Sequence, residues 1–168
     1  MKNFKSHLNL YVLRHADAGE PDSREYPDDS LRPLSEKGKR EAKQVGKLLE
    51  KLEVKLSLIL TSPYTRTLQT AAIVQEILDP KIPLEKTRDL IPSGDPASFT
   101  RQLLKEHSST NLLIVGHEPF LSQWFRHLIK PSTHFHFEPK KASLTKLRHT
   151  PPSHFHLKWH IPPKLTLA

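Results

Sequence analysis

Short apolar runs alternate with longer amphipathic stretches from the start of the chain to about residue 130. Residues 8–13 alternate apolar and polar side chains, and two nearly continuous apolar runs follow at 56–60 and 112–115. Runs of this length bounded by polar residues predict strands, and the two continuous ones predict strands covered on both faces of a sheet.

Helices are predicted between these strands. Ser35 is the expected N-cap of a helix over about 35–52, where apolar residues recur at spacings of three and four. Ser62 is the expected cap of a second helix that begins at Pro63, a position where the missing N–H costs nothing. Asp95-Pro96 begins a third helix in the same way, and an aromatic-rich helix follows residue 119.

The pattern changes after residue 131. Three short stretches, 134–137, 142–147 and 154–159, alternate with period two and are separated by proline-rich turns, which predicts two or three short strands at one sheet edge. The alternation of strands and helices before them predicts an α/β fold, a three-layer α/β/α arrangement around a mostly parallel sheet. Without repeats or linkers, residues 1–168 are expected to form one domain.

Composition narrows the chemistry. The 168 residues include no cysteine, which excludes disulfides, thiolate nucleophiles and zinc sites with sulfur ligands. No apolar run approaches the 18 or so residues that a membrane span needs. The basic N-terminus leads into a short strand-like stretch without a small-residue cleavage site, so we expect a cytoplasmic protein.

The charge is concentrated near the C-terminus. The chain carries 26 basic and 18 acidic residues, for a net charge of +8, and residues 119–168 hold eight Lys or Arg against one acid, Glu138. An anionic partner is expected, and this segment either steers an acidic phosphoprotein or forms a solvated basic face. A nucleic-acid surface is not favoured, because the aromatic residues alternate as core residues do.

Polar sequences follow the three best predicted strands. They are Arg14-His15, Ser62 to Arg66, and Gly116-His117-Glu118. Ligands of α/β sheets bind at the carboxyl ends of the strands, and arginine forks suit phosphate. A neutral histidine there could attack a phosphoryl group, whereas the alternative is that each histidine merely caps or packs at a strand end.

These motifs resemble the signatures of a known family, the histidine phosphatase superfamily, which has a phosphoglycerate-mutase-like fold. Within this superfamily, several further segments resemble the short SixA-type phosphohistidine phosphatases. The superfamily motifs are residues 13–16 (LRHA), 62–70 (SPYTRTLQT) and 115–119 (VGHEP), and the branch motifs are 31–35 with Gly38, 92–95 and 140–142.

The resemblance implies an enzyme, a phosphatase with a phosphohistidine intermediate. His15 would be the nucleophile that is phosphorylated during turnover. Arg14 and Arg66 would hold the phosphoryl oxygens, and His117 would donate a hydrogen bond to them as charge builds in the transition state.

The resemblance also implies roles for two further residues. Arg32 matches an additional phosphate-pocket arginine of the SixA branch, and the alternative is a loop arginine paired with Asp28 or Asp29. Asp89 matches the carboxylate general acid of mutase-like members, and the alternative is a solvated loop acid. Ala16 departs from the glycine common after the nucleophile, which places a methyl group near the pocket.

The length of one connection in the chain bears on the substrate class. About two dozen residues separate Thr70 from Asp95, too few for the helical lid of larger relatives. An open site favours a protein-borne phosphohistidine, for example on a phosphotransfer domain in signal transduction. A phosphatase or mutase of small phosphate esters and a non-catalytic phospho-ligand binding module remain alternatives.

No cofactor and no metal are expected. Two histidine pairs, His134 with His136 and His154 with His156, have a spacing that metals accept. Histidine alternating with phenylalanine is also typical of a half-exposed edge strand, which is the favoured interpretation.

Overall fold

A six-stranded sheet forms the centre of the protein, with strand order β3-β2-β4-β1-β5-β6. The computed structural model describes residues 7–107, 110–130, 136–152 and 154–165. Its strands are β1 (Leu8–Arg14), β2 (Leu58–Thr61), β3 (Leu84–Lys86), β4 (Asn111–Gly116), β5 (Leu144–Thr150) and β6 (His154–Ile161). Its helices are α1 (Glu36–Lys51), α2 (Thr65–Leu78), α3 (Pro96–Glu106) and α4 (Phe120–Ile129), with 3-10 turns η1 (Asp29–Leu31), η2 (Arg88–Leu90) and η3 (Pro163–Leu165).

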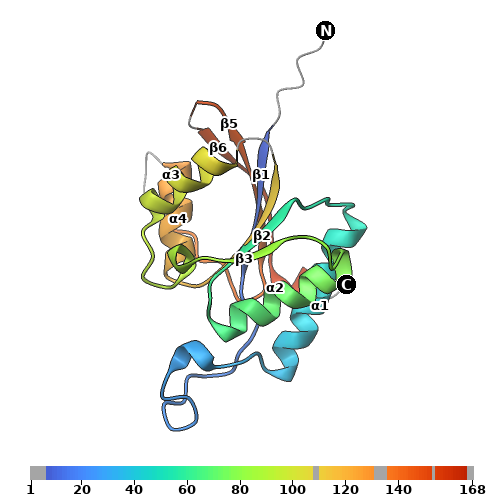
Figure 1. Ribbon diagram of the computed structural model, residues 1–168, viewed down its shortest axis with the longest axis vertical. Coiled ribbons are helices and arrows are strands. Elements are labelled where there is room, and N and C mark those ends of the chain that lie inside the picture. Colours follow the sequence, from blue (N-terminus) through green and yellow to red (C-terminus); the bar gives the residue numbers. More distant parts are fainter. Residues whose placement is uncertain (1–6, 108–109, 131–135, 153, 166–168) are drawn as a thin grey trace.

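Helices cover both faces of the sheet, with α3 and α4 on one side and α1 and α2 on the other (Figure 1). The alternation along β1 explains the two cores. Leu8, Leu10 and Val12 pack in the cluster that contains the apolar residues of α3 and α4, whereas Tyr11 and Leu13 pack in the cluster with α1 and α2. The predicted α/β fold, with three layers, is confirmed.

The sheet is parallel at its centre and antiparallel at one edge. Strand β1 pairs in parallel with β4, and β2 pairs in parallel with β4 and β3. Strands β5 and β6 add on in antiparallel orientation next to β1, as predicted for the C-terminal edge.

The described part of the C-terminal edge holds two strands, within the two or three that were predicted. Of the stretch 134–137, residues 134 and 135 lie outside the described residues, and His136 and Phe137 are not in a strand. Strand β3 was not predicted, because its three residues are half-buried or exposed and form no apolar run.

Strand register brings three loops together. Arg14 at the end of β1 lies opposite Gly116 at the end of β4, and Thr61 at the end of β2 lies opposite Val115. Because these strands are neighbours and parallel, the segments that follow them leave the sheet at the same edge.

Candidate active site

The segments that follow β1, β2 and β4 are joined by backbone hydrogen bonds. The N–H of His15 donates to the carbonyl of Gly116 at 3.1 Å, and the N–H of Ser62 donates to the carbonyl of Val115 at 3.1 Å. The rings of His15 and His117 then lie 5.1 Å apart, centroid to centroid. The structure therefore brings together the two histidines predicted from the strand ends.

His15 is a buried, neutral imidazole with one nitrogen fixed. Its Nδ1 lies 2.8 Å from the carbonyl oxygen of Ala16, which can only accept, so Nδ1 carries the proton and Nε2 keeps its lone pair. Burial is the main cause that lowers the pKa of His15 to about 3; the bond to Ala16 opposes it, and the charges of Arg66 and Arg14 add to it. At neutral pH this ring is therefore uncharged, with the lone pair of Nε2 available.

His117 is buried and held by a hydroxyl group. Its Nε2 lies 2.9 Å from Ser62 Oγ, and the ring of Tyr64 packs against it edge-on at 4.8 Å. Burial, followed by the proximity of His15 and the Arg66 guanidinium, lowers the pKa of His117 to about 2. The second histidine is therefore also neutral.

The predicted capping role of Ser62 was wrong. Helix α2 begins at Thr65, and its N-cap, Tyr64, makes no side-chain capping bond. The Ser62 hydroxyl accepts from the Tyr64 N–H at 3.4 Å, just before the helix, and also contacts His117, 55 residues away in the chain. A local sequence rule favoured the cap, but the shorter contact of this hydroxyl is with a distant partner.

Arg14 and Arg66 are anchored by different segments of the chain. Arg14 Nη1 donates to the carbonyl of Pro139 at 2.9 Å and lies 3.8 Å from Glu138 Oε1. Arg66 Nη1 donates to the carbonyl of Asp29 at 2.7 Å. Each guanidinium is anchored by one end in this way.

Five buried side-chain nitrogens have no hydrogen-bond partner within the described part of the chain, and three of them belong to the predicted site residues. These three are Nε of Arg14, Nε of Arg66 and Nδ1 of His117. An unsatisfied buried polar group costs about 1–3 kcal/mol, so such atoms call for an explanation. All three belong to residues that act on His15, two by charge and one by ring contact. Together they could donate hydrogen bonds to a tetrahedral oxyanion next to His15 Nε2.

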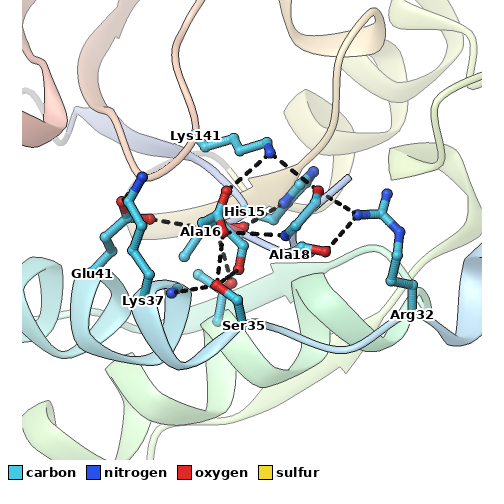
Figure 2. Close-up of polar contacts among 12 residues, drawn as sticks. His15, Ala16, Ala18, Arg32, Ser35, Lys37, Glu41 and Lys141 are labelled. Carbon is cyan, nitrogen blue, oxygen red and sulfur yellow. Dashed lines mark hydrogen bonds and ion pairs between the residues drawn. The ribbon is translucent and has the colours of Figure 1, made fainter. Parts of the chain in front are cut away.

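The loop after His15 is held by a network of polar contacts that includes Ser35, Glu41 and Lys141 (Figure 2). Ser35 Oγ donates to Asp17 Oδ2 at 2.7 Å, and Lys141 Nζ donates to Asp17 Oδ1 at 3.0 Å. Partial burial opposes ionisation of Asp17, but the bonds from Ser35 and Lys141 outweigh it and lower its pKa to about 2. At Gly38 a Cβ atom would lie 1.9 Å from the Asp17 carbonyl oxygen, so the close approach of α1 to this loop requires glycine.

Ala16 is accommodated without backbone strain. Its side chain is fully buried in the cluster on the α1 and α2 side of the sheet. Among the described non-glycine residues, left-handed backbone occurs only at Glu53, Lys130 and Ala142. The methyl group that replaces the usual glycine hydrogen therefore fills core volume.

Arg32 makes the ion pair that was weighed as its alternative role. Its Nε donates to Asp29 Oδ1 at 2.7 Å, and its Nη1 donates to the carbonyls of Ala18 and Gly19 at 2.7 and 2.9 Å (Figure 2 shows the contact with Ala18). The same carboxylate also contacts Arg66. The structure thus links Arg32 to the site through Asp29.

Asp89 lies in η2 and does not contact the four predicted site residues. Its Oδ2 accepts from the hydroxyl of Thr87 at 2.8 Å. It lines a cavity of about 220 Å³ whose other described walls come from β2, β3, the turn after it, and α3 with His107. A role as general acid remains a prediction.

Neither a metal-binding cluster nor a membrane-spanning helix is found among the described residues. Over residues 7–107, 110–130, 136–152 and 154–165, no group of three or more His, Cys, Asp or Glu residues is placed to hold a metal ion. His134, one of the paired histidines, lies outside those ranges. Among the helices described there, none has the length and apolar character needed to cross a membrane.

Acid should destabilise the fold through these histidines. His15 is neutral when folded down to pH about 3, but in the unfolded chain it protonates near its ordinary value of 6.5. Below pH 6.5 the unfolded state binds the extra proton, so the free energy of unfolding should fall by about 1.4 kcal/mol per pH unit for each such histidine. Urea denaturation between pH 7 and pH 5 should therefore show a shallower loss for His15→Gln than for the parent, and equal slopes would contradict a buried neutral ring.

Several proteins are similar to this chain. The family model of the histidine phosphatase superfamily (branch 1) matches residues 10–91. An uncharacterized protein of a Picosynechococcus species is 33% identical over 143 residues, which cover 84% of this chain and 85% of that protein. The phosphohistidine phosphatase SixA of Escherichia coli is 28% identical over 116 residues, 68% of this chain and 70% of that one.

Solved structures share the fold. The protein histidine phosphatase SixA complexed with tungstate superposes with a TM-score of 0.80 at 22% identity, covering 94% of this chain and 98% of that one. A phosphoglycerate mutase from Bacillus anthracis superposes with a TM-score of 0.71 at 16% identity, covering 97% and 96%. The expected phosphoglycerate-mutase-like fold is confirmed.

Proposed function

The chain belongs to the histidine phosphatase superfamily, on its SixA-like side, and is a phosphatase; we propose that its substrate is a phosphohistidine on another protein and that His15 carries the phosphoryl group during turnover. The SixA relative named above is a phosphohistidine phosphatase, and this chain is 28% identical to it over 116 residues. We further propose that it acts in the cytoplasm on a signalling or phosphotransfer protein.

The observation that carries the proposal is the state of His15. Its Nδ1 is committed to the Ala16 carbonyl, its pKa is far below neutrality, and Nε2 keeps a lone pair. The unpartnered buried nitrogens of Arg14, Arg66 and His117 belong to the residues around this ring. A nucleophile beside several donors is the arrangement that phosphoryl transfer needs.

The reaction then has two steps. His15 Nε2 attacks the phosphorus, a new N–P bond forms, and the P–N bond to the substrate imidazole breaks as that imidazole leaves with a proton. Water next attacks the phosphorus, the bond to His15 Nε2 breaks, and inorganic phosphate forms. A protonated imidazole is a good leaving group, so the first step needs little help from an acid such as Asp89.

The neighbouring residues would stabilise charge in both steps. Nε of Arg14 and Nε of Arg66 can donate to phosphoryl oxygens while their other nitrogens stay anchored. His117 donates from Nδ1 if its Nε2 accepts the proton of the Ser62 hydroxyl. Ser62 would thereby set the tautomer of His117, and Arg32 would act from the rim of the site.

The short connection between α2 and α3 supports a protein substrate. From Leu78 to Pro96 the chain forms only the short strand β3 and the turn η2, with no additional helix to close over the site. Next to Arg32, the side chain of Leu31 is 62% exposed. A site without a helical lid in this connection and with an exposed apolar side chain beside Arg32 suits a large partner better than a small metabolite.

A substrate panel tests the proposal. We expect kcat/KM for a histidine-phosphorylated phosphotransfer domain to exceed that for phosphoglycerate and a sugar phosphate by about 100-fold or more. Release of inorganic phosphate at equal enzyme concentration is the measurement, and His15→Ala supplies the blank. Faster turnover of the small esters would instead identify a metabolite phosphatase or mutase, and binding of all substrates without turnover would identify a binding module.

A further inference from the structure

Asp29 contacts two arginines, Arg32 and Arg66. Its Oδ1 accepts from Arg32 Nε at 2.7 Å, and its Oδ2 lies 3.0 Å from Arg66 Nη2. Its backbone carbonyl also accepts from Arg66 Nη1 at 2.7 Å. One residue therefore binds two guanidinium groups with three oxygen atoms.

This arrangement differs from an ordinary surface ion pair. Arg32 and Arg66 are 7% and 5% exposed, and their like charges disfavour each other. Partial burial opposes ionisation of Asp29, but the bond from Arg32 and the two guanidinium charges outweigh it and lower the pKa of the carboxyl group. A carboxylate shared by two buried cations holds both at once, which an exposed pair does not do.

The direction of these bonds determines which donors stay free. Asp29 occupies both Nη1 and Nη2 of Arg66, and the remaining nitrogen, Nε, is the buried one without a described partner. Arg32 uses Nε for Asp29 and Nη1 for the carbonyls of Ala18 and Gly19, in the loop that follows His15. Asp29 thus fixes Arg66 in rotation and ties it to that loop.

From this geometry we infer that Asp29 is a positioning residue, which orients Arg66 so that its Nε edge is presented to the phosphoryl group and couples that edge to the loop carrying His15. The inference rests on the proposed function for the identity of the ligand. It assigns Asp29 no contact with the substrate, because its oxygens are engaged by the arginines.

Simple electrostatics and positioning predict opposite results for Asp29→Asn. Removing a negative charge makes the site more positive, so charge alone would tighten the binding of inorganic phosphate. The asparagine amide can accept from one arginine only and presents N–H groups to the other, so positioning predicts that phosphate binding weakens by about tenfold. It also predicts a loss in kcat/KM for phosphoimidazole of about 10- to 100-fold.

Two variants make the test specific. Asp28→Asn is the matched control, because Asp28 has the same charge next to Asp29 but bonds to Ser30 and to neither arginine among the described contacts. It should leave phosphate binding and kcat/KM within about twofold of the parent. Asp29→Glu should recover most of the loss, because it keeps the charge and both oxygens, and the 47% exposure of the Asp29 side chain leaves room for one more methylene.

A cycle with Arg66→Lys identifies the residue through which Asp29 acts. In that background Asp29→Asn should cost less than about threefold further, because the guanidinium it orients is gone. Calorimetric binding of inorganic phosphate, kcat/KM and the thermal unfolding midpoint are measured for every variant. Loss with an unchanged midpoint, recovery by glutamate and non-additivity with Arg66→Lys would establish the role.

Other outcomes overturn it. Tighter phosphate binding by Asp29→Asn, or behaviour equal to that of Asp28→Asn, would show that Asp29 does not position Arg66. A loss with a lowered midpoint and no recovery by glutamate would show a purely structural role. A parent that binds phosphate as described but hydrolyses no phosphohistidine would overturn the proposed function and leave the inference about Asp29 standing.

Discussion

Replacing His15 with alanine should lower kcat by about 10⁴-fold or more, because no other described group can take over the attack on phosphorus. The chain has no cysteine, and His117 has its Nε2 engaged by Ser62. Binding of phosphate should weaken far less than turnover, because Arg14, Arg66 and His117 remain. Phosphate release from a phosphorylated phosphotransfer protein is measured under single-turnover and steady-state conditions, which gives the rate of the chemical step and kcat.

The intermediate can be trapped on the same residue. Brief incubation with a ³²P-labelled phosphohistidine protein followed by denaturation should leave label on the parent chain and none on His15→Ala. A label on histidine is stable to alkali and labile to acid, which separates it from phosphoserine and from an acyl phosphate on Asp or Glu. His156→Ala on the exposed face of β6 is the control and should behave as the parent. Label retained by His15→Ala would place the nucleophile elsewhere.

The residues at the centre of the site could be predicted from the sequence, because the ends of apolar runs indicate where strands end. Arg14 and His15 end the first run, and His117 follows the last of the three parallel runs. Parallel neighbours must deliver such residues to one edge, whatever their order in the sheet. The order itself, with β4 between β1 and β2, depends on packing across the whole sheet and could not be obtained from local patterns.

The supporting residues could not be predicted, because their partners are distant in the chain. Ser62 reads as a helix cap until His117 is placed beside it, and nothing near Gly38 indicates that the Asp17 carbonyl approaches it. Asp29 and Asp28 are equivalent acids in the sequence, and only the fold brings one of them to Arg66. Local rules describe elements, whereas contacts between loops depend on tertiary structure.

Part of the C-terminal positive charge serves the fold. Lys146 lies over the ring of Tyr11, with Nζ 5.1 Å from its centroid, and Arg148 Nε donates to Asn9 Oδ1 at 3.2 Å. Both contacts join β5 to β1. Lys141 donates to Asp17 in the loop after β1, so reversing the charge of Lys141 would disturb that loop as well as any steering of a substrate. Lys140 alone is the cleaner position for testing steering.

Arg66→Lys should reduce kcat/KM by about 10²- to 10³-fold, although the positive charge is kept. Lysine carries its three N–H donors on one nitrogen, so it cannot present one edge to the carbonyl and carboxylate of Asp29 and another edge to a phosphoryl oxygen. The guanidinium does both, through Nη1 and Nη2 on one edge and Nε on the other. If that Nε bond strengthens as charge builds in the transition state, kcat should fall more than KM rises.

The matched control is Arg24→Lys. Arg24 is 92% exposed and pairs only with Asp22 on the loop surface, so the same substitution there should change kcat/KM by less than about twofold. Steady-state rates with phosphoimidazole avoid any contribution from protein docking to either variant. A loss of kcat/KM confined to Arg66→Lys would show that activity depends on the planar, forked guanidinium of Arg66 and not on its positive charge alone. Activity of Arg66→Lys within about threefold of the parent would mean that charge alone suffices, and both the role of Arg66 and its orientation by Asp29 would then be wrong.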